Sequence, residues 1–454
     1  MEERLSVQFL AHNRTPVDIS NGMHIFTRPL ITEVIGGQIG DMLDDGGQIE
    51  LHIPFTGFGY VIEEYSWIFN LAREFNLYRL DDVTQLEYLE DPREHPMQLG
   101  TSVRFVHTRY RHSSNVCAIA LAIAEVNKEW FRERPGYKDA LLVAALTHDT
   151  LTPAGGDTTK AIDRSGFDED AQYHTCMTAQ RREFLLKHGV DPGLCIRTVQ
   201  GNGVLGTILD IADKLAYVGH DLVAFAGLPL FGHLEYMRKV GFARHLRKNL
   251  LFCRIWESVR IENDTAWCED AEGLTRFLII RAQLFRQLYT HPKARYREAL
   301  LMFQTLSFLY EEGLLSRTQL LSMNDGDLRI FLQEKVNWRP DRMLPSKGNF
   351  TPKHRRFENL SDAKEFEVSL LREGRLFVRQ ENLTKVFKPA HHFKVRKGTQ
   401  IDSLQKLFPE LAIRIDNAGQ TIDPIRVSYL DGEEPDLGPL TSAFKAWSLK
   451  RSTT

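Results

Sequence analysis

The sequence predicts a mainly α fold, with a large helical core, a small β-hairpin region before it and a smaller α+β region after it. Apolar residues recur at helical spacing through most of residues 109–313. Short runs that alternate between apolar and polar residues lie near the two ends of the chain. The 454 residues are 43% hydrophobic and 26% charged. This composition is typical of a globular protein with about two or three structural units.

The N-terminal region, residues 1–94, is expected to be mixed. In GGQIELHIPF (46–55) the apolar residues alternate after an Asp-Asp-Gly-Gly turn, which predicts a β-hairpin. From Ile62 to about Phe75 apolar residues recur near helical spacing, which predicts a helix.

The central region, residues 95–336, is expected to be the helical core. One helix is predicted to begin near Arg109, and its apolar residues lie on one face. The segment ALLVAALT (140–147) is apolar all round and runs directly into His148 and Asp149, so it predicts a buried helix. Further helices are predicted over 207–225, 274–291 and 296–313, the last with Gly313 as a C-cap.

The C-terminal region, residues 337–454, differs from the helical core in composition and in its apolar pattern. Prolines and a glycine punctuate a basic stretch that reaches Lys353–Arg356, and short β-like runs such as RLFVRQ and HHFKVRK follow. We expect a smaller α+β region. The basic stretch is interpreted as a solvated surface, with an anion or single-stranded nucleic acid as the alternative ligand.

Two histidines and two aspartates form a candidate metal site. His148 and Asp149 follow the buried helix, where an unpaired charge would be costly. His112 lies on a polar edge of the preceding helix, and Asp213 lies within the helix predicted over 207–225. Two imidazoles and two carboxylates suit one divalent ion such as Mn, Mg, Fe, Ni or Zn, and they leave positions open for water and a phosphate oxygen.

The order H…HD…D in these helices resembles the HD-domain metal-dependent phosphohydrolases. R-Y-R-H (109–112), D-K-L-A-Y-V-G-H-D (213–221) and the segment from Arg281 to His291 are most similar to the dNTP triphosphohydrolase branch. That branch includes the bacterial dGTPases and the animal SAM-and-HD-domain dNTPase. The resemblance implies a homo-oligomer that hydrolyses a deoxynucleoside triphosphate at the α-phosphorus, releasing the deoxynucleoside and tripolyphosphate.

The resemblance also assigns roles to individual residues. It implies that the metal ligands are His112, His148, Asp149 and Asp213. It assigns phosphate, sugar or base contacts to Gln98, Leu99, Arg109, Lys214, Tyr217, Asp221, Arg281, Tyr289 and His291, and a catalytic position near the α-phosphate to His174.

The loop after Asp149 departs from the family pattern. Counted without gaps, Thr152 and Asp157 stand where the family has two histidines, and Lys160 stands where it has an acid. The usual proton donor to the leaving group is therefore missing. Asp157 is expected to replace it if its carboxyl is protonated near working pH.

Localisation and partners follow from composition. The N-terminal residues lack the layout of a signal peptide, and no stretch approaches the roughly 18 apolar residues of a membrane span. Five cysteines without a C-x-x-C pair indicate reduced thiols. We expect a cytoplasmic protein without a membrane partner. Its net charge of −3 gives no global reason for nucleic-acid binding.

Two alternative functions stay open. One is another phosphohydrolase of the same fold, a nucleotidase or a cyclic-nucleotide phosphodiesterase. The other is a catalytically weak nucleotide sensor, which the missing loop histidine favours and the complete set of metal ligands disfavours.

Overall fold

The structure is a computed structural model in which the main helical core is described almost continuously. The described residues are 18–20, 23–27, 43–44, 48–52, 58–63, 67–83, 108–225, 255–285, 289, 304–336, 353–373, 375, 377–381, 392–419, 425–429 and 438–453. For the strands up to residue 63, and for residues 220–225, only the backbone is described. The predicted region boundaries, at 94/95 and 336/337, adjoin residues outside these ranges and stay predictions.

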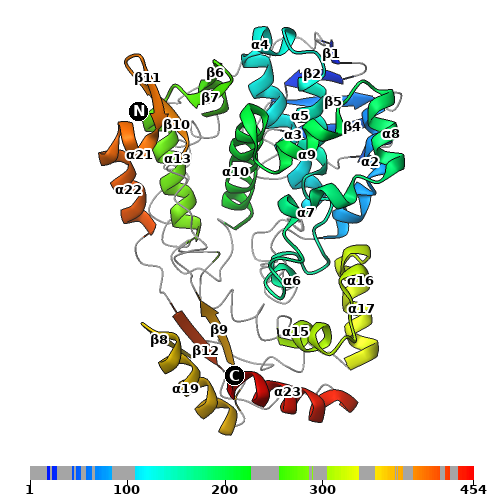
Figure 1. Cartoon of the computed structure of the whole chain (residues 1–454), viewed down its shortest axis with the longest axis vertical. Coiled ribbons are helices and arrows are strands. Elements are labelled where there is room, and N and C mark those ends of the chain that lie inside the picture. The colour runs from blue at the N-terminus through cyan, green and yellow to red at the C-terminus, as the bar shows by residue number, and fades with distance from the viewer. Residues whose placement is uncertain are drawn as a thin grey trace, which may run out of the picture.

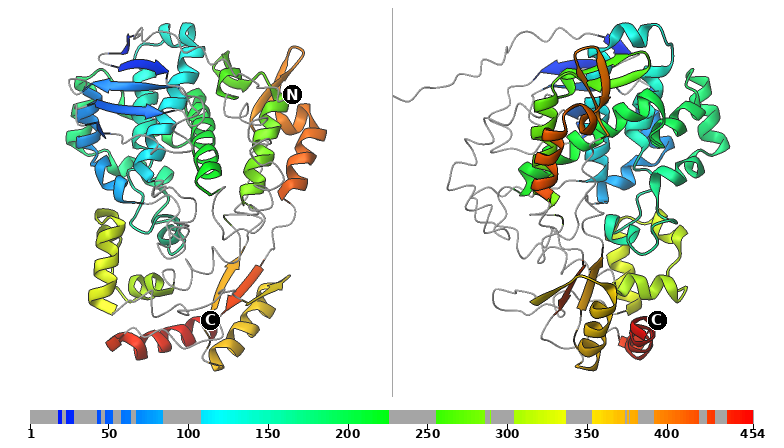
Figure 2. Two further views of the ribbon diagram at one scale, coloured as in Figure 1. Left: turned by 180° about the vertical axis from the view of Figure 1, so that it is seen from behind. Right: turned by 60° about the vertical axis from the view of Figure 1, so that its left-hand side comes forward.

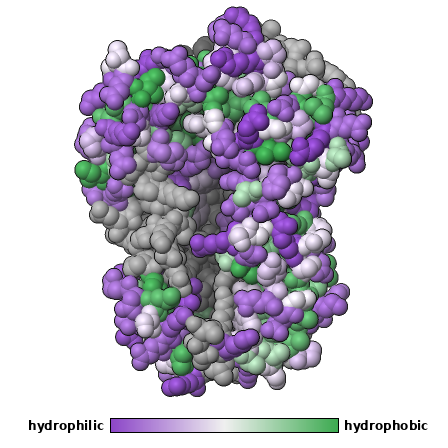
Figure 3. All heavy atoms as spheres, in the orientation of Figure 1, coloured by the Kyte–Doolittle hydropathy of each residue, from purple (hydrophilic) through white to green (hydrophobic). Residues whose placement is uncertain are grey.

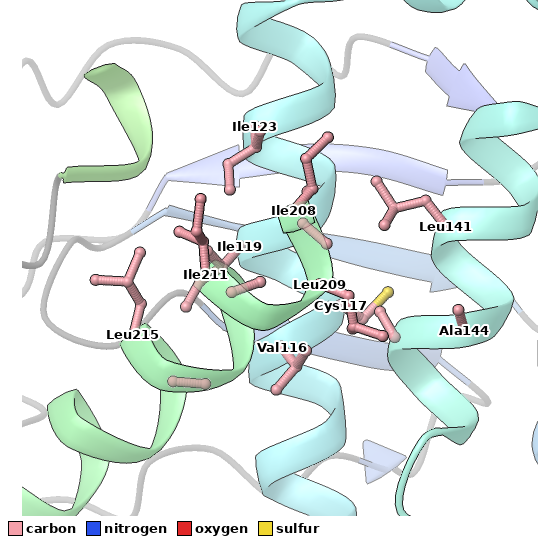
Figure 4. Close-up of a cluster of buried hydrophobic side chains, with 14 of the residues drawn as sticks. Val116, Cys117, Ile119, Ile123, Leu141, Ala144, Ile208, Leu209, Ile211 and Leu215 are labelled. Atoms are coloured by element: carbon pink, nitrogen blue, oxygen red, sulfur yellow. The ribbon is translucent and has the colours of Figure 1, made fainter. Parts of the chain in front are cut away.

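Three helices form the centre of the main core, and they confirm the predicted mainly α fold. α3 (Arg109–Val126) packs against α5 (Tyr137–Thr147) on one side and against α10 (Gly203–Phe225) on another. Figure 4 shows the apolar side chains of the three helices meeting in one buried cluster. Residues 116–124 of α3 and 140–147 of α5 are buried all round, which accounts for the absence of a polar stripe along them.

Shorter helices surround this centre (Figure 1). Several begin with a side-chain cap: Asp168 accepts from the Ala171 amide, Thr178 from the Arg181 amide and Asp191 from the Gly193 amide. These helices are α2 (Trp67–Glu74), η1 (Leu77–Asp82), α4 (Lys128–Arg132), α6 (Gly156–Lys160), α7 (Glu169–Cys176), α8 (Ala179–Lys187) and α9 (Pro192–Val199).

The N-terminal region forms an antiparallel sheet whose described strands have the order β1-β2-β5-β4-β3. The predicted hairpin is confirmed, because Leu43 pairs with Ile49. The predicted helix from Ile62 is wrong in its first turn, because Ile62 pairs with both neighbouring strands and the helix begins only at Trp67. The strands are β1 (Asp18–Ser20), β2 (Met23–Thr27), β3 (Leu43–Asp44), β4 (Gln48–His52) and β5 (Phe58–Glu63).

On the other side of α10 lies a layer built from two distant parts of the chain (Figures 1 and 2). Val395 pairs in parallel with Cys268, which adds part of the predicted C-terminal region to the main core. This layer contains β6 (Val259–Glu262), β7 (Thr265–Cys268), α13 (Ala271–Leu284), β10 (Lys394–Lys397), β11 (Gln400–Ser403), α21 (Leu404–Leu407) and α22 (Pro409–Gly419).

Two smaller hydrophobic cores complete the described fold. The second core joins Ala154 and Phe167 to α15 (Gln304–Glu311), α16 (Arg317–Ser322), α17 (Asp325–Val336) and α23 (Thr441–Thr453), which follows η7 (Gly438–Leu440). Gly313 follows α15 with φ of 70°, as expected of a C-cap glycine. The third core joins β8 (Lys353–Phe357), α19 (Leu360–Arg372), β9 (Phe377–Glu381) and β12 (Ile425–Tyr429), with strand order β8-β12-β9.

The described surface is mostly hydrophilic. Figure 3 shows polar residues over most of the described part of one face, with apolar residues scattered among them. The basic residues 353–356 are all exposed on β8. Among the described residues, no helix combines the length and the apolar composition needed to cross a bilayer.

Candidate metal centre and nucleotide pocket

The ends of the three central helices bring the predicted metal ligands together. Thr108 caps α3 by accepting from the Arg111 amide, which places His112 in the first turn. His148 follows the last residue of α5, and Asp213 lies within α10. The candidate ligand atoms of His112, His148 and Asp213 all lie within 4.8 Å of one another.

Asp149 completes the cluster. His112 Nε2 lies 2.9 Å from Asp213 Oδ1 and 3.8 Å from Asp149 Oδ2. His148 Nε2 lies 3.7 Å from Asp149 Oδ1 and 3.9 Å from Asp213 Oδ1. Each imidazole therefore has two carboxylate oxygens within 4 Å, and the four residues surround one small space.

The orientation of His148 fits a metal ligand. Its Nδ1 lies 2.9 Å from the Ala145 carbonyl oxygen, so in the neutral ring Nδ1 donates and the lone pair is on Nε2. Nε2 is buried and has no hydrogen-bond partner among the described residues. A buried acceptor without a donor is costly, and a divalent cation would satisfy it. The donor set of imidazole and carboxylate suits Mn, Fe, Ni or Zn.

Metal affinity is expected to rise with pH. Burial lowers the pKa of His148, but the Asp149 and Asp213 carboxylates outweigh it, so the pKa is raised above the ordinary value. In the metal-free chain, protonated His148 contributes stability below about pH 6.5 that is lost as pH rises through the raised pKa. Since Nε2 binds metal only without its proton, the Mn²⁺ association constant should increase up to about tenfold per pH unit below that pKa. Calorimetric titration from pH 5.5 to 8.5 measures it, and a constant affinity would contradict the assignment.

Arg109 connects the cluster to the altered loop. It is 5% exposed, and its guanidinium lies 3.5 Å from Asp149 Oδ2 and donates to Asp157 Oδ1 at 2.8 Å. Lys160 Nζ lies 3.4 Å from the same Asp157 oxygen. Asp157 is therefore held between two cations at the side of the pocket.

Glu169 at the start of α7 is a second acidic group of this region. Its carboxylate accepts from Lys160 Nζ at 2.6 Å and from the Thr152 hydroxyl. Burial raises the pKa of Glu169 to about 7, with Asp149 adding to the effect and Lys160 opposing it. A carboxyl of this pKa holds its proton in a large fraction of molecules at neutral pH.

One face of α10 supplies the next part of the pocket wall. Asp213 and Tyr217 lie on it with Lys214, whose ammonium pairs with Asp210 one turn earlier. The segment before β10 reaches the same place, because His392 Nε2 lies 3.5 Å from Asp210 Oδ2 and the Phe393 ring lies 5.4 Å from Lys214 Nζ.

The opposite wall combines one cation with aromatic rings. Arg281 of α13 is 6% exposed, and its Nε donates to the Tyr217 hydroxyl. The guanidinium lies 4.8 Å from the centre of the Phe285 ring, and Tyr289 packs against both Phe285 and Tyr217. The hydrogen bond and the ring contact hold Arg281 in one orientation.

One cavity of about 630 Å³ is lined by the His-Asp cluster, by the cationic side chains of Lys214 and Arg281, and by the aromatic rings of Phe285 and Tyr289. This volume is in the range of small-molecule binding sites. Ten of the predicted site residues line the cavity: Arg109, His112, His148, Asp149, Asp157, Asp213, Lys214, Tyr217, Arg281 and Tyr289.

The remaining predicted residues are not placed at the cavity by the described structure. His174 lies on α7, is exposed, and does not line the cavity; its Nδ1 lies 3.0 Å from the Ala171 carbonyl oxygen. Three predicted residues lie outside the described residues, namely Gln98, Leu99 and His291, and for Asp221 only the backbone of α10 is described.

Several lining residues were not predicted. Asp210 lies one turn before Asp213 and could have been found from helical spacing alone. Glu169 and Asp170 follow the helix cap Asp168, and nothing in the neighbouring sequence predicted that they line the cavity. His392 and Phe393 reach the cavity only through the parallel pairing of β10 with β7, which local sequence patterns do not encode.

The fold and the cluster define a mainly α protein whose central helices carry a His-Asp group able to hold a metal ion. No family model matches the chain, and no curated protein matches it. Solved structures share its fold, among them the following two. A hypothetical protein from Aquifex aeolicus aligns with TM-score 0.55 and 18% identity over 88% of this chain and 99% of its own. A phosphohydrolase from Bacteroides thetaiotaomicron aligns with TM-score 0.55 and 13% identity over 84% and 99%. At these identities the likeness concerns the fold alone.

Proposed function

We propose that this chain is a metal-dependent phosphohydrolase that cleaves deoxynucleoside triphosphates with water to deoxynucleoside and tripolyphosphate. The observation that carries the proposal is the shared cavity, in which the His112–His148–Asp213 group lies with Lys214 and Arg281. The fold similarity to a protein named phosphohydrolase supports the general reaction class. The deoxynucleotide substrate and the α-phosphorus rest on the family resemblance.

The cation is proposed to be held by His112, His148, Asp149 and Asp213. A divalent ion there supplies a Lewis acid that makes a hydroxide nucleophile available near neutral pH. The chain's own residues restrict where the substrate lies. The imidazoles and carboxylates line the same cavity as Lys214 and Arg281, so the anionic tail is proposed to lie along these cationic side chains.

The cations and aromatic rings divide the cavity into two subsites. Lys214 and Arg281 neutralise phosphate oxygens, and the planar Arg281 fork suits two oxygens at once. The Lys214 ammonium donates to Asp210, and its other N–H groups can bind a phosphate oxygen. Tyr289 and Phe285 offer ring faces to a base or sugar.

The loop after Asp149 lacks the family's usual proton donor, so another residue must protonate the leaving group. The resemblance expects Asp157 there, but Asp157 lies between two cations, Arg109 at 2.8 Å and Lys160 at 3.4 Å, and a carboxylate held in this way is a poor acid. Glu169 lines the same cavity and, among the described residues, pairs with Lys160 alone, and burial raises its pKa to about 7 in spite of that pair. We therefore propose Glu169 as the general acid.

Glu169→Gln is expected to lower turnover by about 10²- to 10⁴-fold with little change in nucleotide affinity, because the glutamine oxygen can still accept from Lys160 but the amide cannot give up a proton at this pH. Asp157→Asn, the matched variant, should lower turnover by less. Steady-state hydrolysis and equilibrium nucleotide binding of both variants measure this. If Asp157→Asn lowers turnover more than Glu169→Gln does, Asp157 is the general acid and the proposal for Glu169 is wrong.

Product identification tests the proposed reaction. Metal-replete protein is incubated with each dNTP and NTP, and the phosphate products are resolved by ion chromatography. Tripolyphosphate with deoxynucleoside is the expected result. Orthophosphate or pyrophosphate would favour another phosphohydrolase, such as a nucleotidase. Absence of any product from protein that binds both metal and nucleotide would favour a nucleotide sensor, which the ion-paired Asp157 supports.

A further inference from the structure

The loop after His148 and Asp149 is held by a cation that does not line the cavity. Arg79 of η1 donates through Nη2 to the carbonyl oxygens of Thr150 at 3.1 Å and Thr152 at 2.8 Å. Its Nη1 donates to the carbonyl oxygen of Met323 at 2.9 Å. One guanidinium therefore ties the loop that follows a proposed metal ligand to the connection between α16 and α17.

The helices on either side of that connection, α16 and α17, hold the other end of the loop. The Ala154 amide donates to the Leu320 carbonyl oxygen at 2.9 Å, and the Gly155 amide donates to Asp325 Oδ1 at 2.8 Å. The Ala154 side chain is fully buried in the second hydrophobic core with residues of α15, α16 and α17. Gly155 has φ of 76°, and an added Cβ would lie 2.7 Å from the Thr159 hydroxyl and 3.3 Å from Leu328.

The two ends of this loop adjoin residues that line the cavity. It begins at Asp149, whose carboxylate lies within 4 Å of both imidazoles, and it leads into α6 with Asp157, the ion-pair partner of Arg109. A displacement of about 1 Å in such a segment is enough to disturb a coordination sphere. Arg79 and Asp325 do not line the cavity, and their hydrogen bonds reach it through the loop backbone.

We propose that Arg79 is a positioning residue of the metal centre, which docks the loop 150–156 onto the helical unit of α15–α17 so that Asp149 stays in place. The inference rests on the proposed metal centre. A planar fork is needed because three carbonyl oxygens on two separate segments are bound at once; the Lys ammonium lacks that geometry.

The helical unit of α15–α17 also contains α23, because Phe444 and Trp447 pack against Phe308. The C-terminal helix is therefore linked to the proposed metal centre through the second hydrophobic core.

The test compares Arg79→Met and Arg79→Lys with a matched control, Arg73→Met. Arg73 lies in the last turn of α2 and is exposed. Hydrogen–deuterium exchange of the metal-free chain is measured for the peptide that covers residues 150–156 and, as an internal reference, for α3 and α5. The Mn²⁺ dissociation constant is measured by electron paramagnetic resonance.

In Arg79→Met, exchange of residues 150–156 should rise by roughly tenfold or more while α3 and α5 stay protected, since hydrogen bonds to a charged group are lost. The Mn²⁺ dissociation constant should rise by about 10- to 100-fold, as when a ligand loses its supporting contact. Arg79→Lys should lie between wild type and Arg79→Met, and Arg73→Met should match wild type in both measurements.

Unchanged loop exchange and unchanged Mn²⁺ affinity in both Arg79 variants would overturn the proposal. If Arg79→Met fails to fold, Arg79→Lys decides: wild-type exchange and affinity in that variant would also overturn it. Faster loop exchange with unchanged Mn²⁺ affinity would overturn the link to the metal. Absence of Mn²⁺ binding by the wild-type chain would instead contradict the metal centre of the proposed function, and the positioning role would fail with it.

Discussion

Replacing His148 and Asp149 together by alanine is expected to remove the divalent cation and abolish metal-dependent hydrolysis. The two residues supply half of the proposed donor set, and His148 Nε2 is a buried acceptor without a hydrogen-bond partner among the described residues. Four-donor structural zinc sites bind with about 10–16 kcal/mol, so losing two donors should weaken binding by roughly four orders of magnitude or more. Elemental analysis after dialysis against Mn²⁺, together with the hydrolysis rate, measures both effects.

His188→Ala is the matched control for the double variant. His188 stacks on Trp67 with ring centres 5.1 Å apart and does not line the cavity, so this variant should retain metal. Circular dichroism confirms that both proteins are folded. A double variant that is folded and carries as much metal as wild type would show that these residues are not the ligands.

Arg109→Met is expected to lower the free energy of unfolding by about 3–5 kcal/mol, because it removes one partner of a buried ion pair. Burial raises the pKa of Asp149, but His148, Arg109 and His112 together hold it well below the ordinary value. A carboxylate with a depressed pKa stabilises the fold above about pH 4 and loses that contribution as pH falls through the folded-state pKa. At pH 7 Asp149 is ionised, so the full loss in Arg109→Met is expected there. Urea denaturation of both proteins at pH 7 measures it.

The matched control for Arg109→Met is Arg132→Met, a substitution on the surface of α4. The Arg132 side chain is 75% exposed and pairs with Glu129 on the surface. Exposed pairs contribute about 0–1 kcal/mol, so this variant should be nearly as stable as wild type. Equal destabilisation by the two substitutions would mean that the Arg109–Asp149 contact adds nothing beyond a surface pair.

The central helices and the cluster of His and Asp side chains were predictable because their signals are local. The all-apolar run 140–147 identifies a buried helix, and the polar His148 and Asp149 at its end need partners. Helical spacing within α10 places Asp213, Lys214 and Tyr217 near one another. In the structure these residues line one cavity, as the sequence predicted.

What could not be predicted depends on contacts between distant segments. His392 approaches Asp210 because β10 pairs with β7, and Arg79 reaches Thr152 because η1 lies beside the loop. Ile62 continues a helical apolar pattern, yet pairing with strands on both sides keeps it in the sheet. The ion pair between Asp157 and Arg109 likewise follows from the fold, and it changes which carboxyl suits the role of acid.

Anomalous diffraction at the manganese edge locates the cation most directly. Crystals are grown with Mn²⁺ and a deoxynucleoside α,β-imidotriphosphate, which resists cleavage at the α-phosphorus. The expected result is one anomalous peak about 2.0–2.3 Å from donor atoms of His112, His148, Asp149 and Asp213, with the phosphates extending toward Lys214 and Arg281. A bound analogue with no anomalous peak among these four residues, or with its phosphates directed away from the two cations, would contradict the proposed metal centre.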